Sequence, residues 1–326
     1  MNLNLYDTQM NRIAIIGSQF ISCLWSEGYN TTQAFTLELQ ITSEYKKKVK
    51  PDCYVGRTDR KTLMVLKTVQ IQNGHIVATG MQAGRCLDDV PFVGTIAAGA
   101  NVAQSIKEAY DGGDGYTAFS FADGALTDTY GHDISNKSIL ALCEKMGQET
   151  DVGFRTVRSG GGIVTEFYKP EENPNLVLSE RFGNMTVNGI TLSTQNWKNH
   201  AIVLGAGEGE NRIKAEVDIS NGEQKRTLII DARDLTQEEE ETAEAYTARL
   251  VARGVEKLLE CQKTWECAFL PHASEFGSRY DLGDILTVYL QDYDLKLKAR
   301  VTRFTQKSQK NKTSTTIEVG NITITR

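Results

Sequence analysis

The sequence predicts a mainly β protein with an α+β insertion. It is expected to consist of two small antiparallel β-barrel domains, a small α+β domain between them and a long helix inserted in the second barrel. Three observations predict this fold class. Apolar and polar residues alternate over the first hundred positions, helical spacing replaces the alternation from about residue 101, and alternation returns at about residue 184. A period of two residues is typical of a half-buried strand, and a period of 3.6 is typical of an amphipathic helix.

Residues 1–98 are expected to form the first β-barrel. Runs at 63–71 and 75–80 are joined through Asn73-Gly74, and an Asn-Gly step supplies the positive φ angles of a tight hairpin. A further strand is expected at 34–41 because its apolar residues all fall on one face. These residues are Phe35, Leu37, Leu39 and Ile41.

Residues 99–178 are expected to form the small α+β domain. Asn101 is suited to cap a helix that runs from Val102 to Tyr110. A second helix is expected from about Ser135 to Met146, with Gly147 as its C-terminal stop. Strands are expected around these helices at 116–121, 153–157 and 163–168.

Residues 179–235 and 276–326 are expected to form the second β-barrel. Asn188-Gly189 and Asn221-Gly222 mark turns at roughly the spacing of a meander. The C-terminal part is expected to add three strands, at 280–288, 296–304 and 313–324.

Residues 236–275 are expected to be a helical segment inserted in the second barrel. Thr236 and Glu239 have the spacing of a capping box, which marks the start of a helix that is predicted to end near Glu260. Its apolar residues recur at helical spacing. Those expected to pack inward are Leu250, Val255 and Leu258.

Composition excludes several classes of function. The chain has 326 residues, of which 40% are hydrophobic, so it can bury more than one core. The formal net charge is −6 and acids and bases are interspersed, which is not the footprint of a nucleic-acid-binding protein. The two basic runs, at 46–50 and 307–312, are predicted to be solvated loops. We therefore expect no specific nucleic acid binding.

The apolar segments are too short for a membrane protein or a signal peptide. No run of about 18 consecutive apolar residues occurs, so no membrane span is expected. The apolar run from Ile13 to Ile16 is too short for a signal peptide, and we expect the chain to fold in a cytoplasm. The six cysteines contain no CxxC pair and are interpreted as reduced thiols.

No set of residues in the sequence points to catalysis, and we predict no catalytic, cofactor-binding or metal-ligating residues and no cofactor. Gly205–Glu210 resembles a nucleotide-binding loop, but the residues after it predict a strand where such a loop requires a helix. Asp111–Gly115 resembles a calcium loop but lacks ligands at alternate positions. The histidines lie far apart without metal-binding spacing. They are His75, His132, His200 and His272.

Two further groups of residues were weighed as sites. Asp123, Asp128 and Asp133 could supply the acid and base of a glycosidase, but nearby glycines favour turn and capping roles. Three scattered tryptophans are interpreted as core residues and not as a platform for sugar stacking. These are Trp25, Trp197 and Trp265.

Three blocks of sequence, taken in order, resemble the siphophage tail hub family, which is related in fold to the trimeric baseplate hub of contractile-tailed phages. Each block alone is a weak signal, and the likeness lies in their order and spacing over nearly the whole chain. Residues 85–90 depart from the pattern of this family, in which a more basic segment is expected after the first barrel. The blocks are Leu5–Asp7 with Arg12–Ile16, Ser22–Trp25, Tyr29 and Phe35–Leu39; Ile202–Gly207 with Asn211 and Arg212; and Tyr280–Val288.

This resemblance implies a non-enzymatic structural protein of the virion, assembled in the cytoplasm of the bacterial host. It implies a homotrimeric ring at the distal end of the tail tube, in which three subunits with two similar barrels each adapt a sixfold tube to a threefold tip. The implied partners are other tail proteins, namely the distal tail or tube protein, the tape measure protein and tip or fibre proteins.

Two other classes of function remain open from the sequence. A carbohydrate-active or peptidoglycan-active tail enzyme would need a cleft with carboxyl groups of raised pKa. A receptor-binding β protein would be expected to display exposed aromatic residues on long loops. The hub interpretation predicts neither feature.

Overall fold

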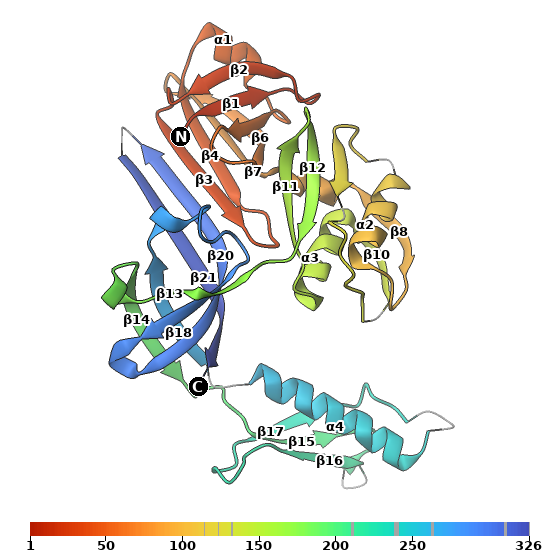
Figure 1. The fold of residues 1–326 in the computed structure, drawn as a ribbon. Helices are drawn as coiled ribbons and strands as arrows, with labels where there is room; N and C mark the ends of the chain where they lie inside the picture. The colour runs from red at the N-terminus through yellow and green to blue at the C-terminus, as the bar shows by residue number, and fades with distance from the viewer. Residues whose placement is uncertain are drawn as a thin grey trace. The chain divides into compact units, whose positions relative to one another are not determined.

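The computed structural model describes residues 1–113, 115–122, 124–131, 133–209, 212–237, 241–261, 264–309 and 312–325. Its residues separate into two compact units, one of 1–186 with 269–326 and the other of 187–268 (Figure 1). The fold is mainly β with a few helices, which confirms the predicted class. No helix within the described ranges has both the length and the apolar character needed to cross a membrane.

An eleven-stranded sheet dominates the unit of residues 1–186 and 269–326. Its strand order is β13-β19-β20-β3-β4-β7-β6-β5-β1-β2, with β21 paired to β20. The strands are β1 (Leu3–Tyr6), β2 (Arg12–Gly17), β3 (Ser22–Gly28), β4 (Ala34–Gln40), β5 (Tyr54–Arg57), β6 (Leu63–Gln72), β7 (His75–Gln82), β13 (Glu172–Leu178), β19 (Ile285–Leu290), β20 (Leu295–Gln309) and β21 (Lys312–Thr325).

Strand β20 joins the N-terminal and C-terminal parts of this sheet. Its first half, Leu295–Arg300, pairs with β19, and its second half, Arg303–Gln309, pairs with β3. Strands β20 and β3 lie side by side in Figure 1. Strands that were expected in two separate barrels therefore belong to one hydrogen-bonded sheet, because a strand of 15 residues is long enough to pair with both groups.

The local features predicted for the N-terminal strands are confirmed. Strands β6 and β7 form the hairpin, with φ of 51° at Asn73 and 77° at Gly74. Phe35, Leu37 and Leu39 are buried on one face of β4. The basic run at 46–50 differs from prediction, because most of it lies in a short helix, α1 (Ser43–Lys48).

The α+β part of the same unit shares a core with the large sheet, because one cluster of buried residues contains Leu63 and Val65 of β6 together with Ile106 and Leu142. Its elements are the 3-10 helix η1 (Ala83–Asp89), β8 (Pro91–Ile96), α2 (Val102–Asp111), β9 (Phe119–Ala122), β10 (Ile134–Ser138), α3 (Ile139–Glu149), β11 (Gly153–Ser159) and β12 (Gly162–Tyr168). Helix α2 is capped as predicted, since Asn101 Oδ1 accepts a hydrogen bond from the Gln104 amide at 2.9 Å. Helix α3 starts later than predicted, because residues 134–138 pair with β8, and it continues past Gly147.

The unit of residues 187–268 combines a three-stranded sheet with helix α4. Strand β15 (His200–Leu204) is central, antiparallel to β16 (Lys214–Asp218) and parallel to β17 (Thr227–Asp231). The expected meander is therefore wrong here, since a meander would make every pair antiparallel. Helix α4 (Ala243–Glu260) lies over this sheet (Figure 1). Strands β14 (Met185–Ser193) and β18 (Thr264–Pro271) pair with each other where the chain passes between the units.

Helix α4 begins later than the capping box predicted. Its N-cap is Thr242, whose hydroxyl accepts a hydrogen bond from the Ala245 amide, while Thr236 is not helical and Glu239 lies outside the described residues. The buried face of the helix carries Tyr246, Leu250, Gly254 and Leu258. Val255 was expected to pack inward but is 41% exposed.

The compact units divide the chain differently from the expected domains. Residues 187–235 pack with α4, and their core contains Val203, Val217 and Leu250. Residues 276–326 belong instead to the unit of the large sheet. Helix α4 thus covers its own three-stranded sheet and does not interrupt a barrel made of 179–235 and 276–326. Further 3-10 helices within the described residues are η2 (Glu180–Phe182), η4 (Ala273–Glu275) and η5 (Gln291–Tyr293).

Candidate functional site

A buried carboxylate organises the interior of the larger unit. Alternation along β3 places Trp25 and Glu27 on the same face of the strand, and Glu27 is only 1% exposed. Its carboxylate accepts hydrogen bonds from Trp25 Nε1 at 2.7 Å and from Thr62 Oγ1 at 2.9 Å. A buried charge is costly unless it is hydrogen-bonded and paired with an opposite charge. These two neutral donors supply hydrogen bonds but no opposite charge.

Arg60 supplies the opposite charge. Its Nε and Nη2 donate to the two oxygens of Glu27 at 2.6 and 2.8 Å, and the guanidinium carbon lies 4.9 Å from the ring centre of Phe276 and 4.7 Å from that of Phe304. Burial lowers the pKa of Arg60, but the attraction and hydrogen bonds of Glu27 and Asp281 together raise it more, so this pKa lies above its ordinary value. Asp281 adds a longer contact of 3.4 Å.

Arg57 lies beside this pair and is incompletely satisfied. Its Nε and Nη2 donate to the carboxylate of Asp59 at 2.9 and 2.5 Å, and these bonds lower the pKa of Asp59. The guanidinium also lies over the ring of Trp25, 5.3 Å from its centre. The remaining nitrogen, Nη1, is buried and has no hydrogen-bond partner among the described residues. Gln306 of β20 is the residue that pairs with Trp25 of β3. Its Oε1 is also buried and has no hydrogen-bond partner among the described residues.

These residues line a cavity of about 510 Å³, which we call the inner cavity. Its walls come from the N-terminal strands, from β11 and β12, and from the C-terminal strands. Among the described residues that line it there is no His or Cys. Its carboxylates at Glu27 and Asp59 each accept two hydrogen bonds from an arginine. The arrangement is suited to binding polar or charged groups. The hydroxyl of Thr62 donates to the carboxylate of Glu27, but both oxygens of that carboxylate are also held by Arg60.

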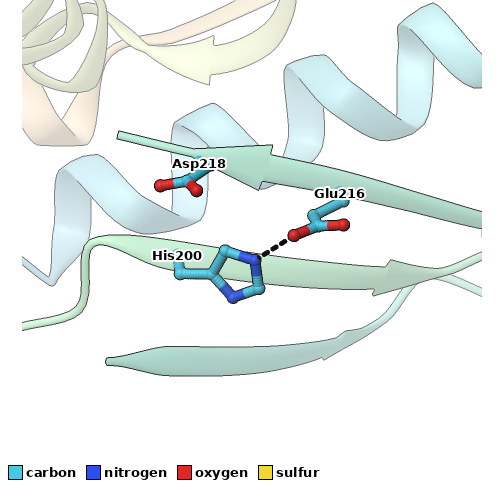
Figure 2. Close-up of side chains that lie close together, drawn as sticks. All are labelled: His200, Glu216 and Asp218. Atoms are coloured by element: carbon cyan, nitrogen blue, oxygen red, sulfur yellow. Dashed lines mark hydrogen bonds and ion pairs between the residues drawn. The ribbon is translucent and has the colours of Figure 1, made fainter. Parts of the chain in front are cut away.

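A second cluster lies on the sheet of the smaller unit. Figure 2 shows His200 of β15 joined to Glu216 of β16, with Asp218 two residues further along β16. His200 is buried, and its Nε2 donates to Glu216 at 2.5 Å because a carboxylate can only accept. Nδ1 lies 3.0 Å from the hydroxyl of Thr227 on β17.

The same cluster has a donor set suited to a metal ion. One ligand atom from each of His200, Glu216 and Asp218 lies within 4.8 Å of the others. The ammonium group of Lys225, however, is 2.8 Å from Asp218 and 3.3 Å from Glu216. Hydrogen bonds from His200 and Lys225 lower the pKa of Glu216, and those from Lys225 and Ser220 lower the pKa of Asp218. Lys225 already supplies the positive charge that a metal would bring, so the cluster is best described as a surface ion network.

The remaining histidines that the sequence singled out are not brought together. His75 contacts Glu38 at 2.8 Å, His272 precedes the 3-10 helix η4, and His132 lies outside the described residues. The loop after Gly205 is followed by strand β16, so the strand predicted there is confirmed. Asp111 pairs with Lys107, and Asp114 lies outside the described part of the chain.

The aspartates and tryptophans have structural contacts. Asp128 pairs with Lys169 at 2.6 Å, and Asp133 accepts a hydrogen bond from the Ala98 amide at 2.8 Å; Asp123 is outside the described residues. Trp25 is buried as predicted, and Arg226 lies over the ring of Trp197 at 4.7 Å. The side chain of Trp265 is not described.

Sequence reasoning missed both clusters described above. A signal for the first was Glu27 itself, a charged residue at an inward position of an alternating strand. The second could not be found from spacing, because Glu216 and Asp218 meet His200 only through the pairing of β15 with β16.

The comparisons with known proteins point in one direction. The family model described as Siphovirus ReqiPepy6 Gp37-like protein matches residues 130–321, more than half of the chain. No curated protein matches in sequence. Three solved structures share the fold at low sequence identity. They are prophage tail protein gp18 from Listeria monocytogenes (11% identity, TM-score 0.56, 98% of this chain and 94% of that one), the 43 kDa tail protein of prophage MuSo2 from Shewanella oneidensis (14%, 0.58, 98% and 98%) and a tail protein from Neisseria meningitidis (10%, 0.55, 98% and 95%).

Proposed function

Because this chain belongs to the Siphovirus ReqiPepy6 Gp37-like protein family, we propose that it is a structural subunit of a bacteriophage tail. The observation that carries the proposal is this family membership. It is supported by a fold shared over 98% of the chain with three solved proteins that are described as tail proteins. A tail subunit is a component of the virion.

Within the tail, the proposed role is that of a homotrimeric hub ring at the distal end of the tube. Strands β2 and β13 end the strand order of the large sheet, and each has one pairing neighbour among the described strands. Exposed edges of this kind invite pairing with another chain unless they are covered. A closed ring of head-to-tail contacts between copies covers such edges, and a ring of three copies matches a threefold tip. The tube protein, tape measure protein and tip or fibre proteins would be the neighbours.

A structural role also fits the chemistry of the inner cavity. Within it Glu27 is paired with Arg60 and Asp59 with Arg57, and its described lining offers no His or Cys. The alternative is a cell-wall-degrading tail enzyme, which would have to cleave the sugar or peptide bonds of the host cell wall. Incubation of the purified protein with purified host cell wall tests this directly: no release of sugars or peptides is expected, and release would favour the enzyme.

Labelling of intact particles tests the location of the protein. Gold-labelled antibodies raised against the purified chain should bind virions at the distal tip of the tail. Labelling along the tube, or of the capsid alone, would contradict the hub proposal. Labelling confined to fibres that extend from the tip would favour a receptor-binding protein instead.

A further inference from the structure

A second hollow, of about 790 Å³, adjoins the inner cavity through shared lining residues and has a strongly basic lining. Asp59 is the one acidic residue among the described residues that line it. This excess of positive charge contrasts with the formal net charge of −6 for the whole chain. We call this feature the basic hollow. Its cations are Arg12, Arg57, Arg60, Lys61 and Arg158.

Two of the five cations are neutralised within the protein. Arg60 is paired with Glu27, and Arg57 is paired with Asp59. Arg57 still has the buried nitrogen Nη1 without a partner among the described residues. A buried donor of a charged group that lacks an acceptor costs free energy, so an acceptor brought by a ligand would stabilise this site.

The other three cations have no acidic partner in the described part of the chain. Arg12 lies on β2, Lys61 precedes β6, and Arg158 lies on β11 with its guanidinium 5.1 Å from the ring centre of Tyr6. All three are exposed. Three separate backbone segments thus present unneutralised cations to one hollow, and their mutual repulsion is relieved when an anionic group enters.

We propose that the basic hollow binds an acidic peptide segment of another protein chain. The clustered carboxylates of that segment would contact the cations of the hollow. Its volume falls in the range of about 300–1,000 Å³ that is usual for ligand sites, which is more space than a single small anion needs. Arginines bind carboxylates in bidentate geometry. Asn4, Asn11 and Thr58 also line the hollow and offer polar groups to a peptide backbone. The binding chemistry follows from the hollow alone, and only the assignment of the acidic chain to a tail partner rests on the proposed function.

The experiment uses the full chain and a fluorescein-labelled hexaglutamate peptide. Binding is measured by fluorescence anisotropy at low and at physiological ionic strength. The test variant combines Arg12→Gln, Lys61→Gln and Arg158→Gln. The control variant combines Arg233→Gln, Arg253→Gln and Lys257→Gln, which removes the same charge from the unit of residues 187–268. Each of these three residues has an acidic partner within that unit. Circular dichroism confirms that both variants are folded.

The peptide is expected to bind the unmodified chain and the control variant with similar affinity, and the test variant at least about tenfold more weakly, because each lost cation removes a charge-assisted contact. Equal weakening in both variants would overturn the proposal, since binding would then follow net charge alone. Failure of the peptide to bind the unmodified chain would overturn it too. Displacement by inorganic phosphate at concentrations as low as those of free peptide would show a phosphate site and overturn the peptide assignment. None of these outcomes depends on the location of the protein in the virion.

Discussion

Glu27 and Arg60 form a two-pronged ion pair inside the larger unit, with nitrogen–oxygen distances of 2.6 and 2.8 Å. Glu27 belongs to β3, and Arg60 belongs to the connection between β5 and β6. The aromatic rings beside Arg60 come from the C-terminal part of the chain, Phe304 on β20 and Phe276 after η4. This pair therefore links the connection between β5 and β6 to the region where β3 pairs with β20, which we call the joint.

Replacing Glu27 tests the weight of this pair. Glu27→Gln keeps the shape but leaves the Arg60 charge buried without its partner, so we expect a loss of about 3–5 kcal/mol in the free energy of unfolding. Urea denaturation measures it. The control Glu44→Gln removes an exposed pair with Lys48 and should cost less than about 1 kcal/mol. Losses of equal size in the two variants would mean that the buried pair does not stabilise the joint.

The helix of the smaller unit offers a matched pair of neighbouring leucines. Leu258 is fully buried against the sheet, whereas Leu259 is 65% exposed. Leu258→Ala should lower the free energy of unfolding by about 2–5 kcal/mol through lost burial and a residual cavity. Leu259→Ala should change it by no more than about 0.5 kcal/mol. If thermal or urea unfolding gave the reverse order, the assigned face of α4 would be wrong.

Asp59 gives a prediction about pH. Its pKa lies below the ordinary value of 3.8 because Arg57 donates two hydrogen bonds to it. A carboxyl group with a depressed folded-state pKa stabilises the fold above its unfolded pKa, and this stabilisation is lost as pH falls through the folded pKa. Below about pH 4 the unmodified chain should thus lose stability more steeply than Asp59→Asn. Urea midpoints measured across this range would run parallel if Asp59 contributed nothing.

The cysteines should differ in reactivity. Burial raises the pKa of Cys23 to about 12, while Cys261 is partly exposed at the end of α4. Because the thiolate is the reactive form, Cys23 should resist iodoacetamide at pH 8 while Cys261 is modified. Mass spectrometry of the digested protein gives the order of labelling. In denaturant the two should react alike, and equal rates in the native protein would contradict the burial of Cys23.

Features set by neighbouring residues could be predicted from the sequence. The Asn73-Gly74 hairpin and the Asn101 cap depend on a few consecutive residues, and both are confirmed. The pairing of β3 with β20 could not be predicted, because alternation identifies a strand but not its partner, and these two strands are far apart along the chain. Val255 was misplaced for a related reason, since an apolar residue at the border of a helical stripe can face either way.

The same limit applies to the candidate sites. Glu27, Arg60 and Phe304 meet only in the folded sheet, and no short motif links them. The basic hollow likewise collects Arg12, Lys61 and Arg158 from three segments that lie far apart along the sequence. Charge runs predict solvated surface, whereas isolated cations converge only through tertiary structure.

The copy number in assembled tails tests the central claim most directly. A reconstruction of intact particles, with this chain fitted into the density at the distal end of the tube, should show three copies around the tail axis. The contacts between neighbours should bury on the order of 2,000 Å² or more, as expected of an obligate interface. Three copies in a closed ring are the result that the hub proposal predicts. Any other copy number at the tip, or density for this chain elsewhere in the tail, would contradict it.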